Sequence, residues 1–145
     1  KIELPDAVAL RPLVAPLAAA LQSENRSEAG RLCSAIATGI VRQLGAPPIR
    51  VSVLAVRPSS DWGELHGLYE PDNGGQVARV SVWMRTAARD DVVKFRTFLR
   101  TLVHEMCHHI DYELYKLPET FHTEGFYARE SALVRELLGE PAMRK

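Results

Sequence analysis

Residues 90–116 read DDVVKFRTFLRTLVHEMCHHIDYELYK, and this stretch decides how the chain folds. Apolar residues recur in it every three or four positions, which predicts one long amphipathic helix. His104 and His108 are four positions apart, so they lie one helical turn apart and can bind one zinc ion. Glu105 is rotated by about 100° from His104, so it can reach a metal-bound water without binding the metal. The pattern H-E-x-x-H therefore predicts a metal centre with a general base.

The apolar residues of this helix lie on a different face from the two histidines. On a helical wheel with Leu102 at zero, the apolar stripe spans about 0° to 100°, whereas His104 and His108 fall at about 200° and 240°. A helix of this kind can pack on a sheet with one side and border a cleft with the other. The stripe consists of Val92, Phe95, Leu99, Leu102, Val103, Met106 and Ile110.

The rest of the chain predicts an α+β fold in a single domain over 1–145. We expect N-terminal helices, a small three-stranded twisted sheet, the H-E-x-x-H helix and a C-terminal helix. Periodicity and turn residues predict helices at 12–24, 28–44 and 123–138 and strands at 49–56, 63–70 and 77–84.

Some boundaries follow from local signals. Residues 1–11 are expected to form an irregular arm. Ser27 is the expected N-cap of the second helix, and Asp90 or Asp91 the expected start of the histidine helix. His66 falls on a predicted strand and is interpreted as structural.

Composition limits the partners that the chain is expected to have. Lys+Arg and Asp+Glu both number 18 in 145 residues, so the zero net charge gives no indication of a nucleic-acid partner. The apolar stretches are too short to span a bilayer. Cys33 and Cys107 occupy apolar helix positions, which predicts buried free thiols and favours a cytoplasmic location. The sequence gives no indication of oligomeric state.

A catalytic zinc ion usually has three protein ligands, so a third ligand must follow His108. The candidates are His122, Glu124 and Glu130. We favour His122, because it stands at a helix start after a turn that brings the chain back. Glu130 is the rival, because it projects from the middle of the last helix.

The neighbours of the motif have less specific interpretations. His109 is expected at the surface or behind a ligand, and Asp111 either accepts a hydrogen bond from a ligand imidazole or is a solvated carboxylate. Cys107 is interpreted as a packed thiol rather than a ligand. The remaining polar neighbours are expected in the core or the cleft wall rather than in catalysis. These are Tyr112, Tyr115, Tyr127 and Arg129.

His104-Glu-Met-Cys-His108 followed by His122-Thr-Glu-Gly-Phe126 resembles the zincin metallopeptidases, and more narrowly the SprT-like group. The resemblance implies a minimal zincin-like fold, a zinc ion on His104, His108 and His122, and a peptide or protein substrate. It does not extend to the DNA-bound substrates of some SprT-like proteins, because the chain has no C-x-x-C pair and no basic tract. Other minimal zincins have a glutamate as third ligand, which keeps Glu130 open.

The expected activity is zinc-dependent peptide hydrolysis with Glu105 as general base. An edge strand of the sheet, for which 77–84 is the candidate, is expected to hold an extended substrate by strand addition. The alternative is a catalytically silent zincin-fold module that binds zinc or a partner, or a subunit active only with a partner. The intact Glu105 argues against that alternative, because a purely structural site needs no base.

Overall fold

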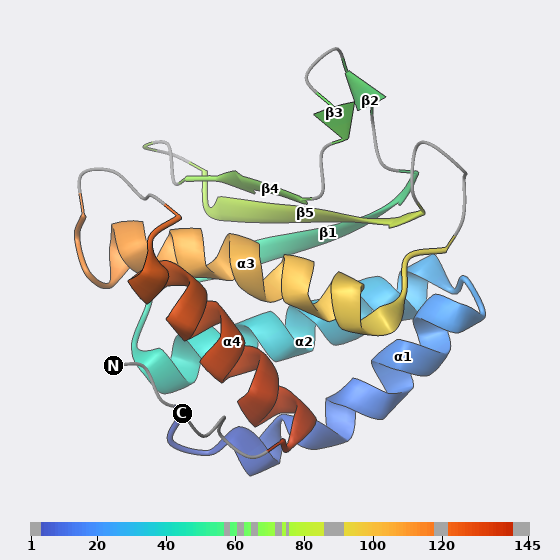
Figure 1. Cartoon of the computed structure of the whole chain (residues 1–145), viewed down its shortest axis with the longest axis horizontal. Coiled ribbons are helices and arrows are strands. Elements are labelled where there is room, and N and C mark those ends of the chain that lie inside the picture. Colours follow the sequence, from blue (N-terminus) through green and yellow to red (C-terminus); the bar gives the residue numbers. More distant parts are fainter. Residues whose placement is uncertain are drawn as a thin grey trace.

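A computed structural model describes residues 4–56, 59–60, 63–64, 67–71, 74, 76–85, 92–117 and 122–140. It shows an α+β fold with four helices and a small three-stranded mixed sheet (Figure 1). The helices are α1 (Val14–Gln22), α2 (Arg26–Leu44), α3 (Phe95–Glu113) and α4 (Glu124–Leu138), preceded by the 3₁₀ turns η1 (Ala7–Ala9) and η2 (Arg11–Leu13). The strands are β1 (Ile49–Val56), β2 (Ser59–Ser60), β3 (Gly63–Glu64), β4 (Gly67–Glu70) and β5 (Ala78–Arg85).

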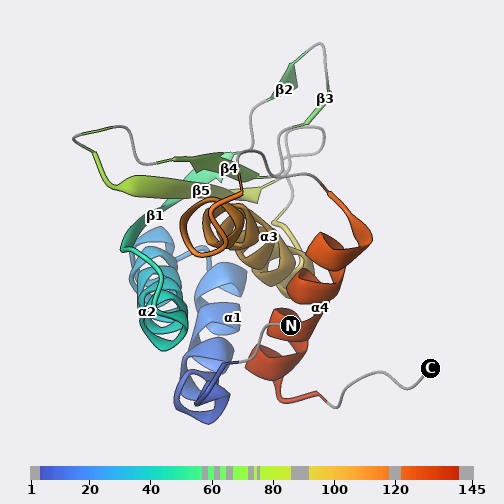
Figure 2. The same ribbon diagram turned by 90° about the vertical axis from the view of Figure 1, so that its left-hand side faces the viewer.

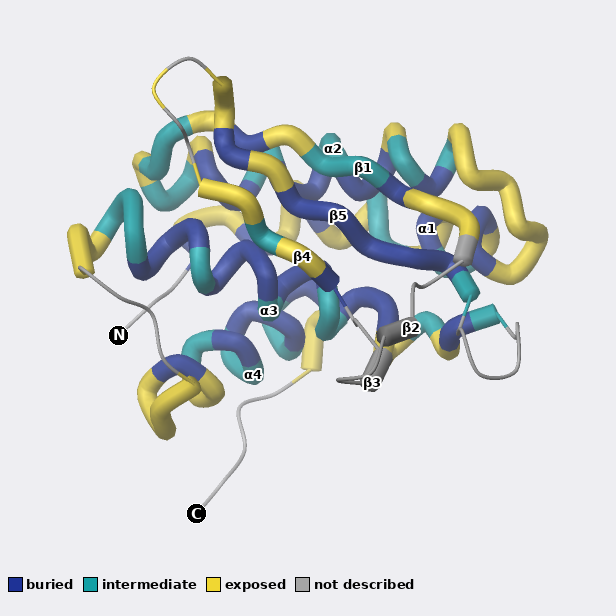
Figure 3. Tube along the Cα trace, turned by 90° about the horizontal axis from the view of Figure 1, so that it is seen from above, coloured by how far each residue is buried: buried dark blue, intermediate teal, exposed yellow. Residues whose placement is uncertain are grey.

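The three-stranded sheet has the order β1-β5-β4, with β5 parallel to β1 and antiparallel to β4. The expectation that 77–84 forms an edge strand is therefore wrong, because β5 is the central strand. Seen from above in Figure 3, β5 is largely buried and lies between the two outer strands. Alternation along a sequence reveals a strand but not its lateral neighbours.

The two described parts of the predicted strand over 63–70 belong to different sheets. β3 pairs with β2 in a two-stranded antiparallel sheet that lies apart from the main sheet, and only β4 joins β5 (Figure 1). His66 lies outside the described residues.

The helices cover one face of the sheet (Figure 2). α2 packs against β1, α3 against β4 and β5, and α4 against α3. Five members of the predicted apolar stripe are confirmed, because Leu99, Leu102, Val103, Met106 and Ile110 are fully buried in the core. The other two, Val92 and Phe95, are partly buried, and Val92 lies before α3. Cys33 and Cys107 are buried free thiols, as predicted.

Two helix starts differ from those predicted. Asn25, not Ser27, caps α2: its side chain accepts a hydrogen bond from the backbone N–H of Glu28 at 3.1 Å. α3 begins at Phe95, not near residue 90, because Val92 and Val93 are held beside the end of β5 through a bridge to Arg85 and a 2.7 Å hydrogen bond to Met84. Asp90 and Asp91 lie outside the described residues.

The N-terminal segment is more ordered than the irregular arm that was expected. It contains two 3₁₀ turns, and its residues Leu4, Ala7 and Leu10 are buried. Gln43 of α2 forms hydrogen bonds of 2.9 and 2.8 Å with the backbone of Asp6. The apolar spacing in this short stretch is too irregular to predict the turns. Within the described residues, no helix has the length and apolar character needed to cross a membrane.

Candidate metal centre

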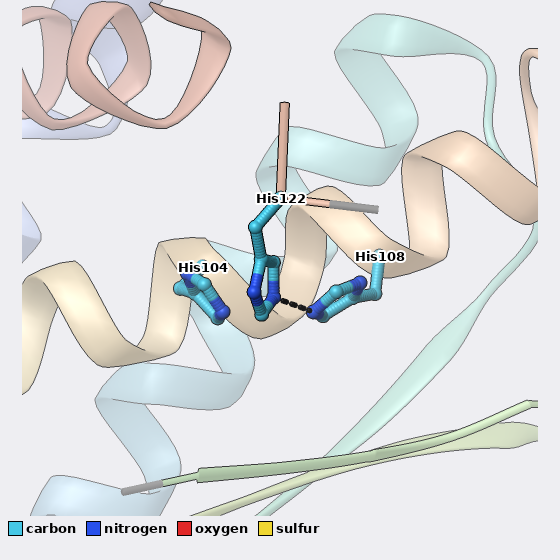
Figure 4. Close-up of side chains that lie close together, drawn as sticks. All are labelled: His104, His108 and His122. Atoms are coloured by element: carbon cyan, nitrogen blue, oxygen red, sulfur yellow. Dashed lines mark hydrogen bonds between the residues drawn. The ribbon is translucent and has the colours of Figure 1, made fainter. Parts of the chain in front are cut away.

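Three histidines, two on α3 and one just before α4, point toward one another (Figure 4). His104 and His108 project from successive turns of α3, and His122 lies two residues before α4. One ring nitrogen from each lies within 4.8 Å of the other two, so the cluster could hold a metal ion. The structure thus brings together the three residues that the sequence predicted as ligands.

One pair of ring nitrogens has the spacing that a tetrahedral ion requires. Nε2 of His122 lies 3.2 Å from Nε2 of His108. Two nitrogens bound to zinc at tetrahedral angles are separated by about 3.3 Å, since each Zn–N bond is about 2.05 Å long. Small movements of His104 would complete a three-nitrogen site.

Local packing holds His122 in this place. The Thr123 side chain accepts a hydrogen bond from the backbone N–H of Phe126 at 3.1 Å and so caps α4. The Phe126 ring is fully buried, and its centroid lies 4.8 to 5.2 Å from the centroids of all three imidazoles. Phe126, the last residue of the H-x-x-x-F segment, therefore forms an apolar wall behind the cluster.

Glu130 stands behind His104 instead of joining the cluster as a ligand. One carboxylate oxygen lies 2.6 Å from Nδ1 of His104, and the other accepts a 3.0 Å hydrogen bond from Arg100. The hydrogen bond to Glu130 raises the pKa of His104. Burial opposes ionisation of Glu130, but its hydrogen bonds from His104 and Arg100 keep the pKa of the carboxyl below its usual value. Since Nδ1 of His104 faces this carboxylate, its Nε2 is the nitrogen left for a metal.

His108 is prepared for metal binding in a different way. Burial, followed by the nearby charges of His104 and His122, lowers the pKa of His108 to about 4. The ring is therefore neutral over the ordinary pH range, as a metal ligand must be.

Glu105 is buried between α3 and β4. Its surroundings raise the pKa of the carboxyl, mainly through burial and also through the charge of Glu130, while His104 acts in the opposite direction. Gly67 of β4 lies so close that a Cβ atom there would be 2.9 Å from Cγ and 3.0 Å from Oε2 of Glu105. The absence of a side chain at residue 67 makes room for this carboxylate.

A cavity of about 660 Å³ opens beside the cluster. It has the size of a ligand pocket. α3 supplies most of its wall, and β4, His122 and α4 supply the rest. The lining residues are Gly67, Arg96, Thr97, Arg100, Thr101, His104, Glu105, His122, Tyr127 and Glu130.

His109 is not at the surface, as one interpretation of the sequence expected, but fully buried. Its Nε2 lies 2.8 Å from the backbone oxygen of Pro47, and its Nδ1 lies 2.8 Å from the Tyr69 hydroxyl. A carbonyl oxygen can only accept, so Nε2 donates and Nδ1 can accept from Tyr69. Tyr69 in turn stacks near His108, with ring centroids 6.5 Å apart. The sequence offered no signal for this link, because its members are distant in the chain.

Asp111 is also buried, which excludes the solvated carboxylate that was one of its two interpretations. It accepts a 2.8 Å hydrogen bond from Arg129, and its charge acts on His108 to raise the imidazole pKa. Arg129 lies over the Tyr115 ring at 5.4 Å. Of the four polar neighbours considered from the sequence, only Tyr127 lines the cavity.

Cys107 is fully buried, and burial raises the pKa of its thiol, which agrees with the interpretation of Cys107 as a packed residue.

The sequence analysis did not identify Arg100 as a residue of the site. Its position four residues before His104, on the same helix face, was the available signal.

No protein-family model, curated protein or solved structure matches the chain. The function is therefore inferred from these residues and their geometry.

Proposed function

We propose that the chain is a zinc-dependent metallopeptidase of minimal zincin-like fold, with His104, His108 and His122 as ligands and Glu105 as general base. The observation that carries the proposal is the convergence of three imidazoles beside a buried carboxylate at the mouth of a cavity. A purely structural site would have no use for that carboxylate.

The donor set suits zinc. Three histidine nitrogens are a common ligand set of catalytic zinc, and they leave a fourth position for water or substrate. A zinc ion bound here would act as a Lewis acid and lower the pKa of a coordinated water to about 7.

Glu105 has the properties of a proton carrier. Its raised pKa brings the carboxyl closer to neutral pH, where a general base works best. In the proposed reaction, Glu105 accepts a proton from the attacking water and then delivers it to the nitrogen of the leaving amine. Its contact with Gly67 restricts where the carboxylate can lie.

The sheet has an outer strand, β4, that could bind an extended peptide beside this site. β4 pairs with β5 along one side, and Gly67 at its start borders the cavity. β4 thus replaces β5 as the strand that could bind a substrate backbone by strand addition.

The proposal is tested by metal analysis of the purified protein, followed by hydrolysis assays with a peptide library. We expect one zinc ion per chain and cleavage that is lost in Glu105→Gln with the zinc retained. Glu113→Gln, in the last turn of the same helix, is the matched control and should cleave normally. Undiminished cleavage by Glu105→Gln would refute the mechanism.

The rival function, a catalytically silent zinc-binding module, predicts a different result. In that case the protein retains zinc but cleaves no peptide, and a cobalt-substituted sample shows four protein ligands by absorption spectroscopy. An open fourth position in that spectrum supports the peptidase.

A further inference from the structure

The cavity extends from the histidines along α3 towards the beginning of the helix. Arg96, Arg100 and His104 line it at intervals of four residues, so they follow one another on the same face. α4, which packs beside α3 in Figure 1, contributes Tyr127 and Glu130 to the opposite wall. Any group that occupies this part of the cavity lies beside these two arginines.

Arg100 is oriented by one hydrogen bond, and the other donors of its guanidinium group are unused among the described residues. Its Nη1 donates to Glu130 at 3.0 Å, and among the described residues this is the one hydrogen bond of its five-donor guanidinium group. Its side chain is 42% exposed, so the remaining donors are accessible to a ligand. Because Glu130 also contacts His104, Arg100 is oriented by the same carboxylate that orients the metal centre.

Arg96 has a partner that a ligand can replace. Both of its terminal nitrogens donate to Glu140, at 2.6 and 2.8 Å, but both side chains are substantially exposed. Water and salt screen an exposed ion pair, although two parallel hydrogen bonds make an arginine–carboxylate pair stronger than an ordinary surface pair. A carboxylate that enters the cavity therefore competes with Glu140 for Arg96.

We propose that this part of the cavity recognises a carboxylate of the substrate, either an acidic side chain or the chain terminus, through Arg100 and Arg96. The inference rests on the proposed peptidase function for its peptide substrate, and it adds the chemical class that the enzyme selects.

The spacing along the helix agrees with recognition close to the cleaved bond. Arg100 lies about 6 Å and Arg96 about 12 Å along the helix axis from His104, at 1.5 Å per residue. An extended peptide advances about 3.4 Å per residue. A carboxylate bound by Arg100 therefore belongs to a residue one or two positions from the bond at the metal, and Arg96 can assist on a longer reach.

The charges on the cavity wall agree with an anionic ligand. The two arginines balance Glu105 and Glu130, and Glu140 beside Arg96 adds one negative charge. A divalent metal ion on the histidines would add two positive charges and make the site net positive. The guanidinium fork also matches a carboxylate in geometry, which an ammonium group does not.

The test measures peptide binding to the zinc-loaded Glu105→Gln protein, so that its readout does not depend on hydrolysis. Fluorescein-labelled alanine-based hexapeptides carry one Glu at each position in turn, matched by Gln. A second set compares a free C-terminal carboxylate with an amide. Fluorescence anisotropy gives the affinity ratio of the acidic to the neutral peptide in each pair.

We expect the best acidic peptide to bind about tenfold more tightly than its neutral match, as one charge-assisted contact provides. Arg96→Gln and Arg100→Lys, each on the same background, should reduce that ratio by at least about threefold. Arg31→Gln is the matched control, because Arg31 is also an exposed helical arginine paired with a glutamate, here Glu28 at 2.7 Å. It should leave the ratio unchanged. If the peptides with Glu bind more tightly than those with Gln, the site recognises an acidic side chain. If the peptides with a free C-terminal carboxylate bind more tightly than the amides, it recognises the chain terminus.

Equal affinities for acidic and neutral peptides, or a preference that survives both arginine variants, would overturn the inference. Failure of the proposed function gives a different pattern. If acidic peptides bind more tightly but the wild-type protein cleaves no peptide, the carboxylate site is supported and the peptidase function is refuted. If the wild-type protein cleaves peptides but acidic and neutral peptides bind equally, the peptidase function is supported and the carboxylate site is refuted.

Discussion

Glu130 on α4 lies 2.6 Å from Nδ1 of His104 on α3, so a carboxylate from one helix orients an imidazole of the candidate metal centre on another. The contact places the Nδ1 proton towards Glu130 and leaves Nε2 towards His108 and His122. The candidate metal centre is therefore coupled to the packing of α4 on α3. His104 and Glu130 are 26 residues apart in the chain, and no local pattern connects them.

Replacement of Glu130 by Gln should weaken metal binding without removing a ligand. The amide keeps the size of the side chain but loses the charge that supports His104. We expect the zinc dissociation constant to rise by about 10- to 100-fold, the range typical of such supporting partners. Competition with a chromophoric chelator measures it. Glu124→Gln, at the exposed start of α4, is the control, and equal affinities of the two variants would contradict the role given to Glu130.

Replacement of His122 by Ala should remove a ligand itself. The metal would retain two protein nitrogens, so zinc should be lost during purification or dialysis. Glu124→Ala serves as the matched control, because Glu124 is two residues away, exposed, and was a candidate ligand in the sequence. Zinc content by plasma emission spectroscopy compares the two. Full zinc occupancy in His122→Ala would exclude this histidine from the site.

The sequence was sufficient to predict that the four helices exist and that the three histidines cluster, although not where every helix begins. His104 and His108 are related by the helical repeat, and His122 precedes a helix whose cap, Thr123, and end, Gly139, are both local signals. These features depend on residues within a few positions of one another, which is why they can be predicted from a single chain.

Features that depend on tertiary contacts could not be predicted from the sequence. β5 is central because β1 and β4 pair with it on either side, and alternation alone carries no such information. His109 is buried because Pro47 and Tyr69 bind both of its ring nitrogens. α3 starts late because residues 92–93 remain attached to the end of β5, which overrides the helical pattern of the apolar residues.

The start of α2 can be tested by a pair of cap variants. Asn25→Ala removes the side-chain oxygen that accepts from the backbone of Glu28, and should lower the free energy of unfolding by about 1 kcal/mol. Ser27→Ala lies inside the exposed first turn and should change it by less than about 0.5 kcal/mol. Urea denaturation followed by circular dichroism measures both. A larger loss of unfolding free energy in Ser27→Ala than in Asn25→Ala would indicate that Ser27 is the N-cap.

Gly67 provides a test of Glu105 that leaves every ligand in place. In Gly67→Ala, the new methyl group would lie 2.8 Å from Cγ2 of Thr101 and 2.9 Å from Cγ of Glu105, distances that force a side chain or β4 to move. Since a shift of about 1 Å in a catalytic group can cost about 100-fold in rate, hydrolysis should fall by about 10- to 100-fold. The zinc affinity should stay within about twofold, because the three histidines are unchanged.

Gly30→Ala is the control for this substitution. Gly30 lies within α2, and a Cβ there would meet no atom within 4 Å, so the variant should be stabilised by about 1 kcal/mol and cleave normally. Peptide hydrolysis, chelator competition and thermal unfolding on both proteins separate displacement of the base from general destabilisation. If Gly67→Ala retains both its zinc and its full rate, then the close approach of β4 does not position Glu105. If it loses zinc and rate together, the substitution has disturbed α3 as a whole, and Glu105 is not restrained by this contact alone.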